Sequence, residues 1–95
     1  MIVDSIRLDK WLWHARFFKS RTRASALCEE GRVRVGGKIV AKAHYAVKVG
    51  DVLTFPQGNR IRVVRVSALI ARRVSAPEAA TLYDDIAPRM PGRAA

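Results

Sequence analysis

The chain has 95 residues, the size of one small domain, with a formal net charge of +10 and a sequence pI near 11.1. Because 49% of its residues are hydrophobic, it has the material for a core and is not a disordered basic tail. No apolar run approaches the roughly 20 residues of a membrane span, and the charge favours nucleic acid first and an anionic membrane surface second.

The amino-terminal residues 1–4 lack the basic and apolar regions of a signal peptide. The single cysteine, Cys28, cannot form an internal disulfide. His14 and His44 are the only histidines, and without a Cys-x-x-Cys pair they do not form a zinc site. Neither has an evident catalytic partner, so both are expected at the surface or in an interface. The sequence therefore predicts a cytoplasmic protein without metal or cofactor.

The first predicted element is a helix, which Asp4 or Ser5 could cap. One apolar stripe follows helical spacing through residues Leu8, Trp11, Leu12, Ala15 and Phe18. Trp11 on this stripe is expected in the core. Trp13 and Phe17 lie off the stripe, where each could stack on a base or make a second apolar contact with the sheet or the last helix.

A second helix is predicted between Ser20 as its N-cap and Gly31 in the C′ position. Cys28 falls on its apolar face and is expected to be a small core residue. Arg21 and Arg23 lie at the positive end of the helix dipole, where cations are unfavourable. Such a locally unfavourable arrangement indicates function, and two arginines beside free helix N–H groups predict a phosphate site.

Beyond residue 31 the apolar period changes to two, which is typical of strands. A hairpin is predicted between residues 33–35 and 38–40, because Gly36 and Gly37 can both take the positive φ of a primed turn. The rest of this region is predicted as a loop at 41–49, a strand at 52–55, a turn at 56–59 and a strand at 60–66.

Ser75 and Glu78 match a capping box, which predicts a short last helix. The apolar face of that helix would carry Ala79, Leu82, Tyr83 and Ile86. The sequence thus predicts an α+β fold, with two N-terminal helices packed on a small, mostly antiparallel sheet and a short C-terminal helix. Residues 1–87 would form one domain, and residues 88–95, which are rich in proline and glycine, a flexible tail.

Cations are dense around the junction of the two N-terminal helices. A solvated face is the ordinary explanation of scattered charges, but this density and the opposed dipole favour phosphate contact. Arg7 and Lys10 lie one helical turn apart and border the same patch, while Lys38 and Lys42 would reach it from the hairpin and the loop. The predicted RNA-binding residues are Arg7, Lys10, Arg16, Lys19, Ser20, Arg21, Arg23, Lys38 and Lys42.

The order and spacing of residues 7–55 resemble the S4 RNA-binding domain. The resemblance rests on Arg7-Leu8-Asp9-Lys10-Trp11-Leu12, Lys19-Ser20-Arg21, Ala24, Leu27, Gly31-Arg32-Val33-Arg34-Val35-Gly36-Gly37-Lys38, Lys42 and Val49-Gly50-Asp51-Val52-Leu53. Asp9-Lys10-Trp11-Leu12-Trp13, Gln57-Gly58-Asn59 and Ala79-Ala80-Thr81-Leu82-Tyr83 look most like the stand-alone fifteen-kilodalton heat-shock protein family. The resemblance implies the alpha-L RNA-binding motif and a ribosome-associated RNA binder.

For that family the implied role is recognition of large ribosomal subunits stalled with tRNA and a nascent chain. Ribosomal RNA and the large subunit are then the expected partners, tRNA is a further candidate, and the protein is expected to be a non-enzymatic monomer. Two departures stand out. Gly36-Gly37 replaces the usual Asn-Gly turn, and the sequence ends at Ala95, before the long basic C-terminal extension of better-known members.

Two other functions remain open at the level of sequence. Domains of this type are often attached to RNA-modifying enzymes, so the chain could be an RNA-targeting module for a separately encoded enzyme. It has neither a Gly-rich cofactor loop nor a catalytic aspartate in a suitable context. Binding to an anionic membrane is the third possibility, but it needs an amphipathic helix whose apolar face is free, and here the fold uses that face.

Overall fold

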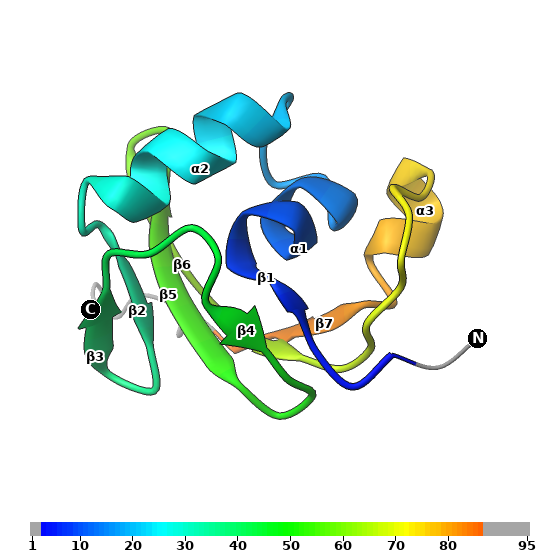
Figure 1. Cartoon of the computed structure of the whole chain (residues 1–95). Helices are drawn as coiled ribbons and strands as arrows, with labels where there is room; N and C mark the ends of the chain where they lie inside the picture. Colours follow the sequence, from blue (N-terminus) through cyan, green and yellow to red (C-terminus); the bar gives the residue numbers. More distant parts are fainter. Residues whose placement is uncertain (1–2, 87–95) are drawn as a thin grey trace, which may run out of the picture.

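A computed structural model describes residues 3–86, which form an α+β fold as predicted (Figure 1). Five strands form one antiparallel sheet in the order β3-β2-β5-β6-β7, and β1 pairs with β4 in a separate two-stranded sheet. In chain order the elements are β1 (Ile6–Arg7), α1 (Leu8–His14), α2 (Arg21–Glu29), β2 (Val33–Val35), β3 (Lys38–Val40), β4 (Ala46–Val47), β5 (Val52–Gln57), β6 (Arg60–Val66), α3 (Ala76–Ala79) and β7 (Tyr83–Asp85).

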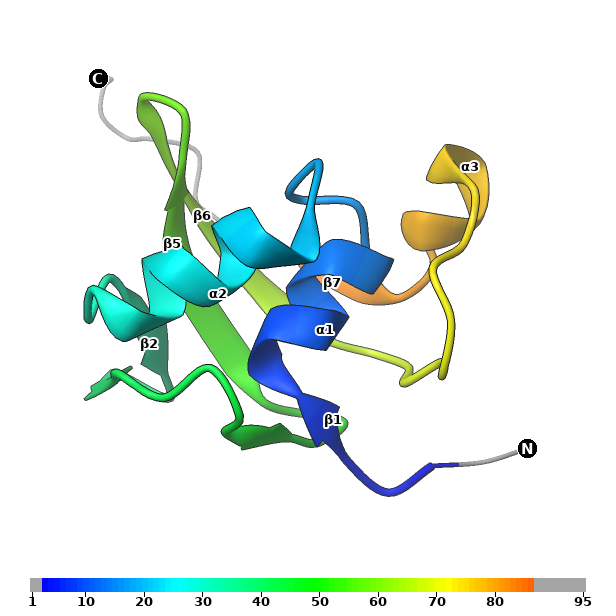
Figure 2. The ribbon, with the colours of Figure 1, turned by 45° about the horizontal axis from the view of Figure 1, so that its top comes forward.

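The core lies between one face of the large sheet and the pair α1 and α2, which cross it side by side (Figures 1 and 2). Alternate side chains of β2, β5 and β6 point toward the helices and form the sheet side of the core. They are Val33, Val35, Leu53, Phe55, Val64 and Val66, all buried. Trp11 from α1 is fully buried, and its indole Nε1–H donates to the carbonyl oxygen of Ala68 at 3.1 Å. The prediction that Trp11 belongs to the core is confirmed.

The local signals of the second helix and the hairpin are also confirmed. Ser20 is the N-cap of α2, and its Oγ accepts the backbone N–H of Arg23 at 3.2 Å. Gly31 follows the helix with a φ of +74°. The turn between β2 and β3 has φ of +60° at Gly36 and +87° at Gly37, the combination of a type I′ turn.

The first helix starts later than predicted. It begins at Leu8, so neither Asp4 nor Ser5 caps it. The residues before it form β1, which pairs with β4 inside the segment that was predicted as a loop. The N–H of Leu8 donates to Tyr45 O at 2.8 Å, so a distant backbone replaces the side-chain cap. A pairing of two residues is too short to leave a periodic pattern in the sequence.

The hairpin of β5 and β6 is longer than predicted. Strand β5 continues through Gln57, and Pro56 pairs with Ile61, so the turn consists only of Gly58 and Asn59. Gly58 has a φ of +64°, which suits a two-residue turn. Proline weakens a strand prediction because it lacks an N–H donor, and the predicted turn at 56–59 was therefore too long.

The prediction of a last helix that extends to Ile86 is mostly wrong. Helix α3 has four residues, and Ser75 occupies its N-cap position without a side-chain hydrogen bond, so the capping box does not form. Tyr83 instead begins β7, which pairs with β6, and Ile86 N–H donates to Val63 O at 2.9 Å. The pairing satisfies backbone groups that β6 would otherwise expose as an edge strand. The predicted tail, 88–95, lies outside the described residues.

Candidate nucleic-acid interface

A buried carboxylate at the start of α1 holds two arginines from different elements. Asp9 is only 1% exposed. Arg7 donates from Nε to Oδ1 and from Nη2 to Oδ2, both at 3.0 Å, and Arg21 Nε lies 3.4 Å from Oδ2. The Arg7 and Arg21 side chains remain 46% and 41% exposed. Each guanidinium is therefore oriented from one side by the protein while the other side faces solvent. We call Arg7, Asp9 and Arg21 the Asp9 clamp.

The electrostatics of the clamp keep Asp9 charged. Burial by itself would raise the pKa of Asp9, but the hydrogen bonds and charge of Arg7, the charge of Arg21 and the backbone N–H of Lys10 together lower it. The carboxyl is thus ionised near neutral pH. Two cations around one buried anion leave one net positive charge within the clamp, partly offset by exposed Glu29 in the same hollow, and the half-exposed guanidinium groups have a fork geometry that suits phosphate oxygens.

The clamp lies along one side of α2, with Arg21 at the N-terminus of this helix. Arg21 is the first residue of this helix, and the first N–H groups of any helix have no intrahelical acceptor. A shallow hollow between α1 and α2 is lined by the clamp together with Thr22, Ser25, Ala26 and Glu29. The hollow therefore runs along α2 from Arg21, its first residue, to Glu29, its last, and only its Arg21 end coincides with the positive end of the helix dipole, where the phosphate site was predicted.

Lys10 and Lys42 also lie near the clamp. Lys10 follows Asp9 in the first turn of α1. Lys42 precedes Ala43, whose carbonyl oxygen accepts the N–H of Asp9 at 3.2 Å. Lys38 is different, because it follows the Gly36-Gly37 turn at the end of the hairpin that lies away from α2 (Figure 1). The structure therefore brings Lys10 and Lys42 to the helix junction and does not bring Lys38 there.

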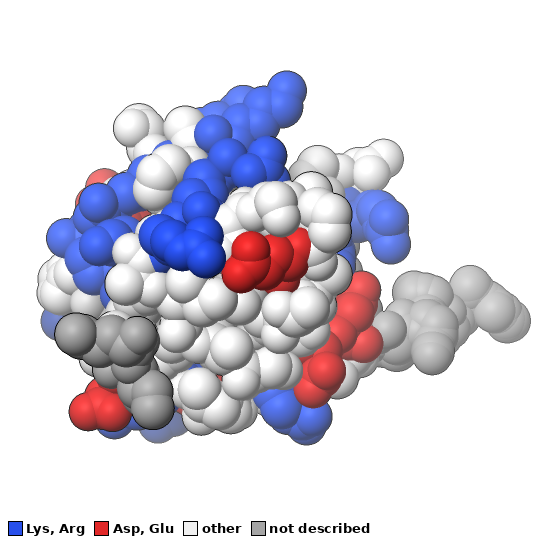
Figure 3. Space-filling model, turned by 90° about the vertical axis from the view of Figure 1, so that its right-hand side faces the viewer, with Lys and Arg blue, Asp and Glu red and all other residues white. Residues whose placement is uncertain are grey.

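Arg16, Lys19 and Arg23 lie on the other sides of the junction. Arg16 follows α1 with a φ of +66°, and its Nη1 donates to Val74 O at 3.1 Å, toward α3. Lys19 and Arg23 line a second hollow, between α2 and the β5–β6 turn. Figure 3 shows Lys and Arg side chains gathered on the upper part of one face, the side on which Figure 1 places α2, with the larger acidic groups below them.

Two residues of this region carry roles that the sequence did not indicate. Asp9 is one, and Arg73 is the other. Arg73 donates from Nε to Trp13 O at 3.1 Å and from Nη2 to Phe18 O at 3.3 Å, and its guanidinium lies 5.4 Å from the centroid of the Trp13 ring. Arg73 therefore holds the α1–α2 connection and covers half-buried Trp13. A basic residue in a segment without periodicity gave no signal for this role.

The prediction that His14 lies at the surface or in an interface is wrong. It is 2% exposed, and its Nδ1–H donates to Ile70 O at 2.8 Å. Burial lowers the pKa of His14, the hydrogen bond to Ile70 acts in the opposite direction, and the charges of Lys10, Arg21 and Arg73 lower it further. His14 is thus a neutral core residue surrounded by cations. His44 is exposed, as expected.

The remaining open assignments favour structural roles. Phe17 is 6% exposed, and its ring lies 4.7 Å from Tyr83 and 5.0 Å from Phe55 between centroids, so it makes the second apolar contact and does not face solvent. Cys28 is fully buried, and burial is the main cause that raises the pKa of its thiol to about 12. Such a thiol is a core residue, as predicted, and is not a nucleophile.

Two other kinds of site are absent from the part of the chain that the structure describes. No three side chains of His, Cys, Asp or Glu lie close enough together there to hold a metal ion. Among the helices described, none has the length and apolar character needed to cross a membrane.

Comparison with known proteins agrees with the observed fold and identifies the family to which the chain belongs. The family model of the S4 domain matches residues 6–53. The chain is 42% identical to a heat shock protein 15 homolog of Haemophilus influenzae, over 90% of this chain and 64% of that protein. It is also 42% identical to the RQC P-site tRNA stabilizing factor of Halalkalibacterium halodurans, over 83% of this chain and 88% of that protein.

A solved structure resembles most of this chain. It is a trimeric structure of Vibrio cholerae heat shock protein 15 and aligns with a TM-score of 0.83 at 38% identity, covering 88% of this chain and 84% of that one. The chain spans less than two thirds of the length of the Haemophilus influenzae relative and of Escherichia coli heat shock protein 15, 64% and 61% respectively. It covers most of the shorter Halalkalibacterium protein.

Proposed function

This chain belongs to the S4 domain family, and from that premise we propose that it is a non-enzymatic protein that binds structured ribosomal RNA through the Asp9 clamp and the N-terminus of α2. The observation that carries the proposal is the clamp itself. A buried carboxylate orients Arg7 and Arg21 and leaves both half-exposed beside α2, whose first residue is Arg21. Phosphates of a folded RNA supply the negative charge that this arrangement accommodates.

We further propose that the RNA belongs to large ribosomal subunits stalled with tRNA and a nascent chain, in the cytoplasm. Support comes from the relatives, which include a P-site tRNA stabilizing factor and heat shock protein 15, neither of which is named as an enzyme. Both clamp arginines come from one chain, so we propose that a monomer suffices for RNA binding. The trimer named for the Vibrio protein is the alternative, which sedimentation of the RNA-bound protein distinguishes.

The proposal is tested by the affinity for purified large subunits over a series of salt concentrations. A phosphate-dominated interface loses affinity with a log–log slope of about −0.9 for each phosphate neutralised on a duplex. We expect a steep slope, and a flat one would exclude this kind of interface. Subunits that carry P-site tRNA should bind more tightly than empty ones if the stalled complex is the target. Equal affinity would reject that finer part of the proposal.

A matched pair of variants locates the binding site. Arg21→Ala removes one clamp arginine, and Arg34→Ala removes an exposed arginine on the face of the sheet that α1 and α2 do not cover. We expect Arg21→Ala to cost about 1.5–3 kcal/mol of binding free energy, as for a hydrogen bond to a charged group, and to make the salt slope shallower. Arg34→Ala should do neither. Equal losses would mean that net charge, and not the clamp, holds the RNA.

A further inference from the structure

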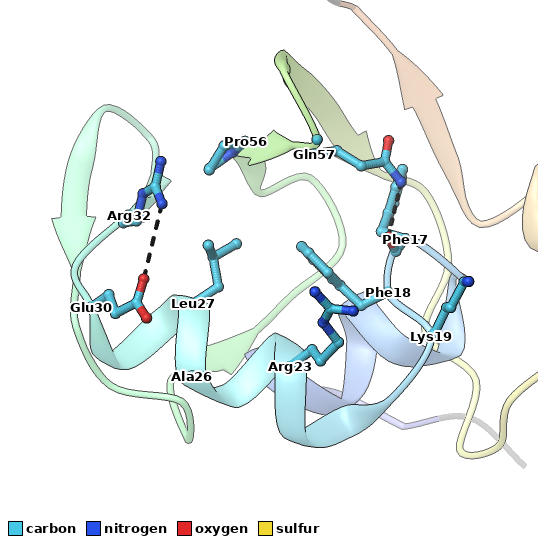
Figure 4. Close-up of a pocket in the computed structure, with 11 residues that line it drawn as sticks. Phe17, Phe18, Lys19, Arg23, Ala26, Leu27, Glu30, Arg32, Pro56 and Gln57 are labelled. Carbon is cyan, nitrogen blue, oxygen red and sulfur yellow. Dashed lines mark hydrogen bonds and ion pairs between the residues drawn. The ribbon is translucent and has the colours of Figure 1, made fainter.

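The second hollow lies on the opposite side of α2 from the clamp, between α2 and the end of β5. It encloses about 510 Å³, within the roughly 300–1,000 Å³ of small-ligand sites. Figure 4 shows Phe18 and Leu27 pointing into it, with Pro56 on the far side. Lys19, Arg23 and Arg32 line its edge, whereas Glu30 is the one acid among the residues that line it. The walls are thus apolar and the rim is basic.

The hollow is preorganised by contacts beneath it. Gln57 donates from Nε2 to Phe17 O at 2.9 Å, and its Oε1 accepts Arg62 Nη1 at 2.8 Å. Arg73 donates to Phe18 O at 3.3 Å. The connection that carries Phe18 and Lys19 is therefore held both from β5 and from the segment before α3. A site whose walls are already ordered loses little entropy when a ligand enters.

The combination of walls and rim selects the class of ligand. A flat apolar group fits against an aromatic ring, a leucine and a proline, and a negative charge next to it fits the cations. A nucleotide has both parts, since any base can stack on an aromatic side chain while its phosphate contacts lysine or arginine. An acidic peptide offers the charge without the flat ring. Of the three cations only Arg32 has an acidic neighbour among the described residues, Glu30 at 4.0 Å.

We propose that this hollow binds one unstacked nucleotide of the RNA, with its base between Phe18 and Leu27 and its phosphate on Lys19 and Arg23. This inference rests on the proposed RNA-binding function. The position of α2 supports it, because exposed Ala26 lines both hollows. A small residue at that crest lets an RNA backbone pass closely over the helix from the clamp to the second hollow.

The test uses two short RNA hairpins that differ by one bulged nucleotide, placed near the loop and made of fluorescent 2-aminopurine. Wild-type protein should bind the bulged hairpin more tightly than the fully paired one and should change the fluorescence of the bulged base. Phe18→Leu keeps an apolar side chain and removes the ring. It should lose about tenfold in affinity for the bulged hairpin, about 1.4 kcal/mol, and almost nothing for the paired one.

Arg21→Ala serves as the comparison, because it should weaken both hairpins to a similar degree. If the protein binds neither hairpin, the proposed function fails. If it binds both with equal affinity, and Phe18→Leu changes nothing, only the nucleotide pocket fails. An acidic peptide that displaces the bulged hairpin from wild-type protein, and loses this ability with Phe18→Leu, would also overturn the choice of ligand.

A second measurement does not depend on a variant. The bulged base is replaced by 4-thiouridine and crosslinked to wild-type protein with light, and the attached peptide is identified by mass spectrometry. The pocket predicts crosslinks at Phe18, Leu27 or the turn after Pro56. Crosslinks confined to the exposed arginines of β2 and β6 would place the base on the uncovered face of the sheet and overturn the proposal.

Discussion

Arginines on the helix side of the molecule and arginines on the uncovered face of the sheet are held in different ways. Arg7 and Arg21 are both bound to buried Asp9. Arg34 and Arg65 are exposed, and neither side chain makes a hydrogen bond or an ion pair with any residue that the structure describes. An arginine that is oriented before it meets a phosphate gives up less side-chain entropy on binding. Equal formal charges on the two faces therefore do not predict equal RNA binding.

The largest expected effect comes from removing Asp9, the buried carboxylate that holds Arg7 and Arg21. Asp9→Ala should lower the free energy of unfolding by about 1.5–3 kcal/mol, the value of a hydrogen bond to a charged group, since the half-exposed arginines regain water. The variant should also bind RNA more weakly, because Arg7 and Arg21 lose their common orientation. Urea unfolding and RNA titration at one salt concentration measure the two effects.

Asp4→Ala is the matched control, since Asp4 is exposed and the substitution removes the same negative charge. If charge alone governed affinity, both variants would bind RNA more tightly than wild type. If Asp9→Ala lowers RNA affinity while Asp4→Ala raises it, the position of the arginines matters and not only the net charge. Tighter binding by Asp9→Ala would contradict the role of the clamp.

The next effect distinguishes a structural arginine from a merely charged one. Arg73→Ala removes hydrogen bonds to Trp13 O and Phe18 O and should destabilise the fold by about 1–3 kcal/mol, because two partly buried carbonyls lose their donor. Arg72→Ala removes the neighbouring arginine, which is 68% exposed and pairs only with Glu78 at 3.6 Å among the described residues. Its expected cost is about 0–1 kcal/mol. Similar melting temperatures for the two variants would refute the difference.

A smaller effect should be confined to the core under α2. Cys28→Ser places a hydroxyl where a buried thiol packs and should cost about 1 kcal/mol, the lower end of the penalty for a buried polar group, because the hydroxyl can bond to a helix carbonyl. RNA affinity of the folded variant should equal that of wild type, because the side chain does not reach the clamp surface. A drop in affinity at unchanged stability would assign Cys28 to the interface.

Sequence reasoning succeeded where the cause is local. Ser20, Gly31 and the Gly36-Gly37 turn act through their own backbone and nearest neighbours, so a cap, a helix end and a hairpin could be predicted from them. The sequence also indicated that Lys10 and Arg21 lie near each other, whereas Lys38, which was expected in the same patch, lies at the far end of the hairpin. The pairing of Arg7 and Arg21 through Asp9 could not be predicted from the sequence. Arg21 lies 12 residues from Asp9 and contacts it only after α1 and α2 pack.

The same limit explains the errors near the C-terminus. Arg73 acts on carbonyls 55 and 60 residues earlier, and His14 meets Ile70 across 56 residues. Leu82 is buried in the observed structure and would be buried in the predicted helix as well, so its apolar character could not separate the two. What decided the conformation was the need of β6 for a neighbouring strand, which is a property of the assembled sheet.

The smallest expected effect is a loss of stability in mild acid, and it should originate on the helix side. The folded-state pKa of His14 lies below the ordinary 6.5, first because of burial and then because of the charges of Lys10, Arg21 and Arg73. Between that lowered pKa and 6.5 the unfolded chain binds more protons than the folded one, so stability should fall as pH falls through this window and level off below it. Asp9 adds a further loss only below its ordinary 3.8, where its lowered pKa lies.

Urea unfolding at about pH 7.5 and about pH 5 measures the contribution of His14. His14→Gln should cost some stability at both values while removing most of the difference between them, because an amide can still donate to Ile70 O and cannot titrate. His44→Gln changes an exposed histidine and should keep the wild-type pH dependence. If His14→Gln retained that dependence, the acid-sensitive group would lie elsewhere. If His14→Gln lost that dependence, His14 would be the acid-sensitive group, and its burial beside Lys10, Arg21 and Arg73 would account for the lower stability in acid.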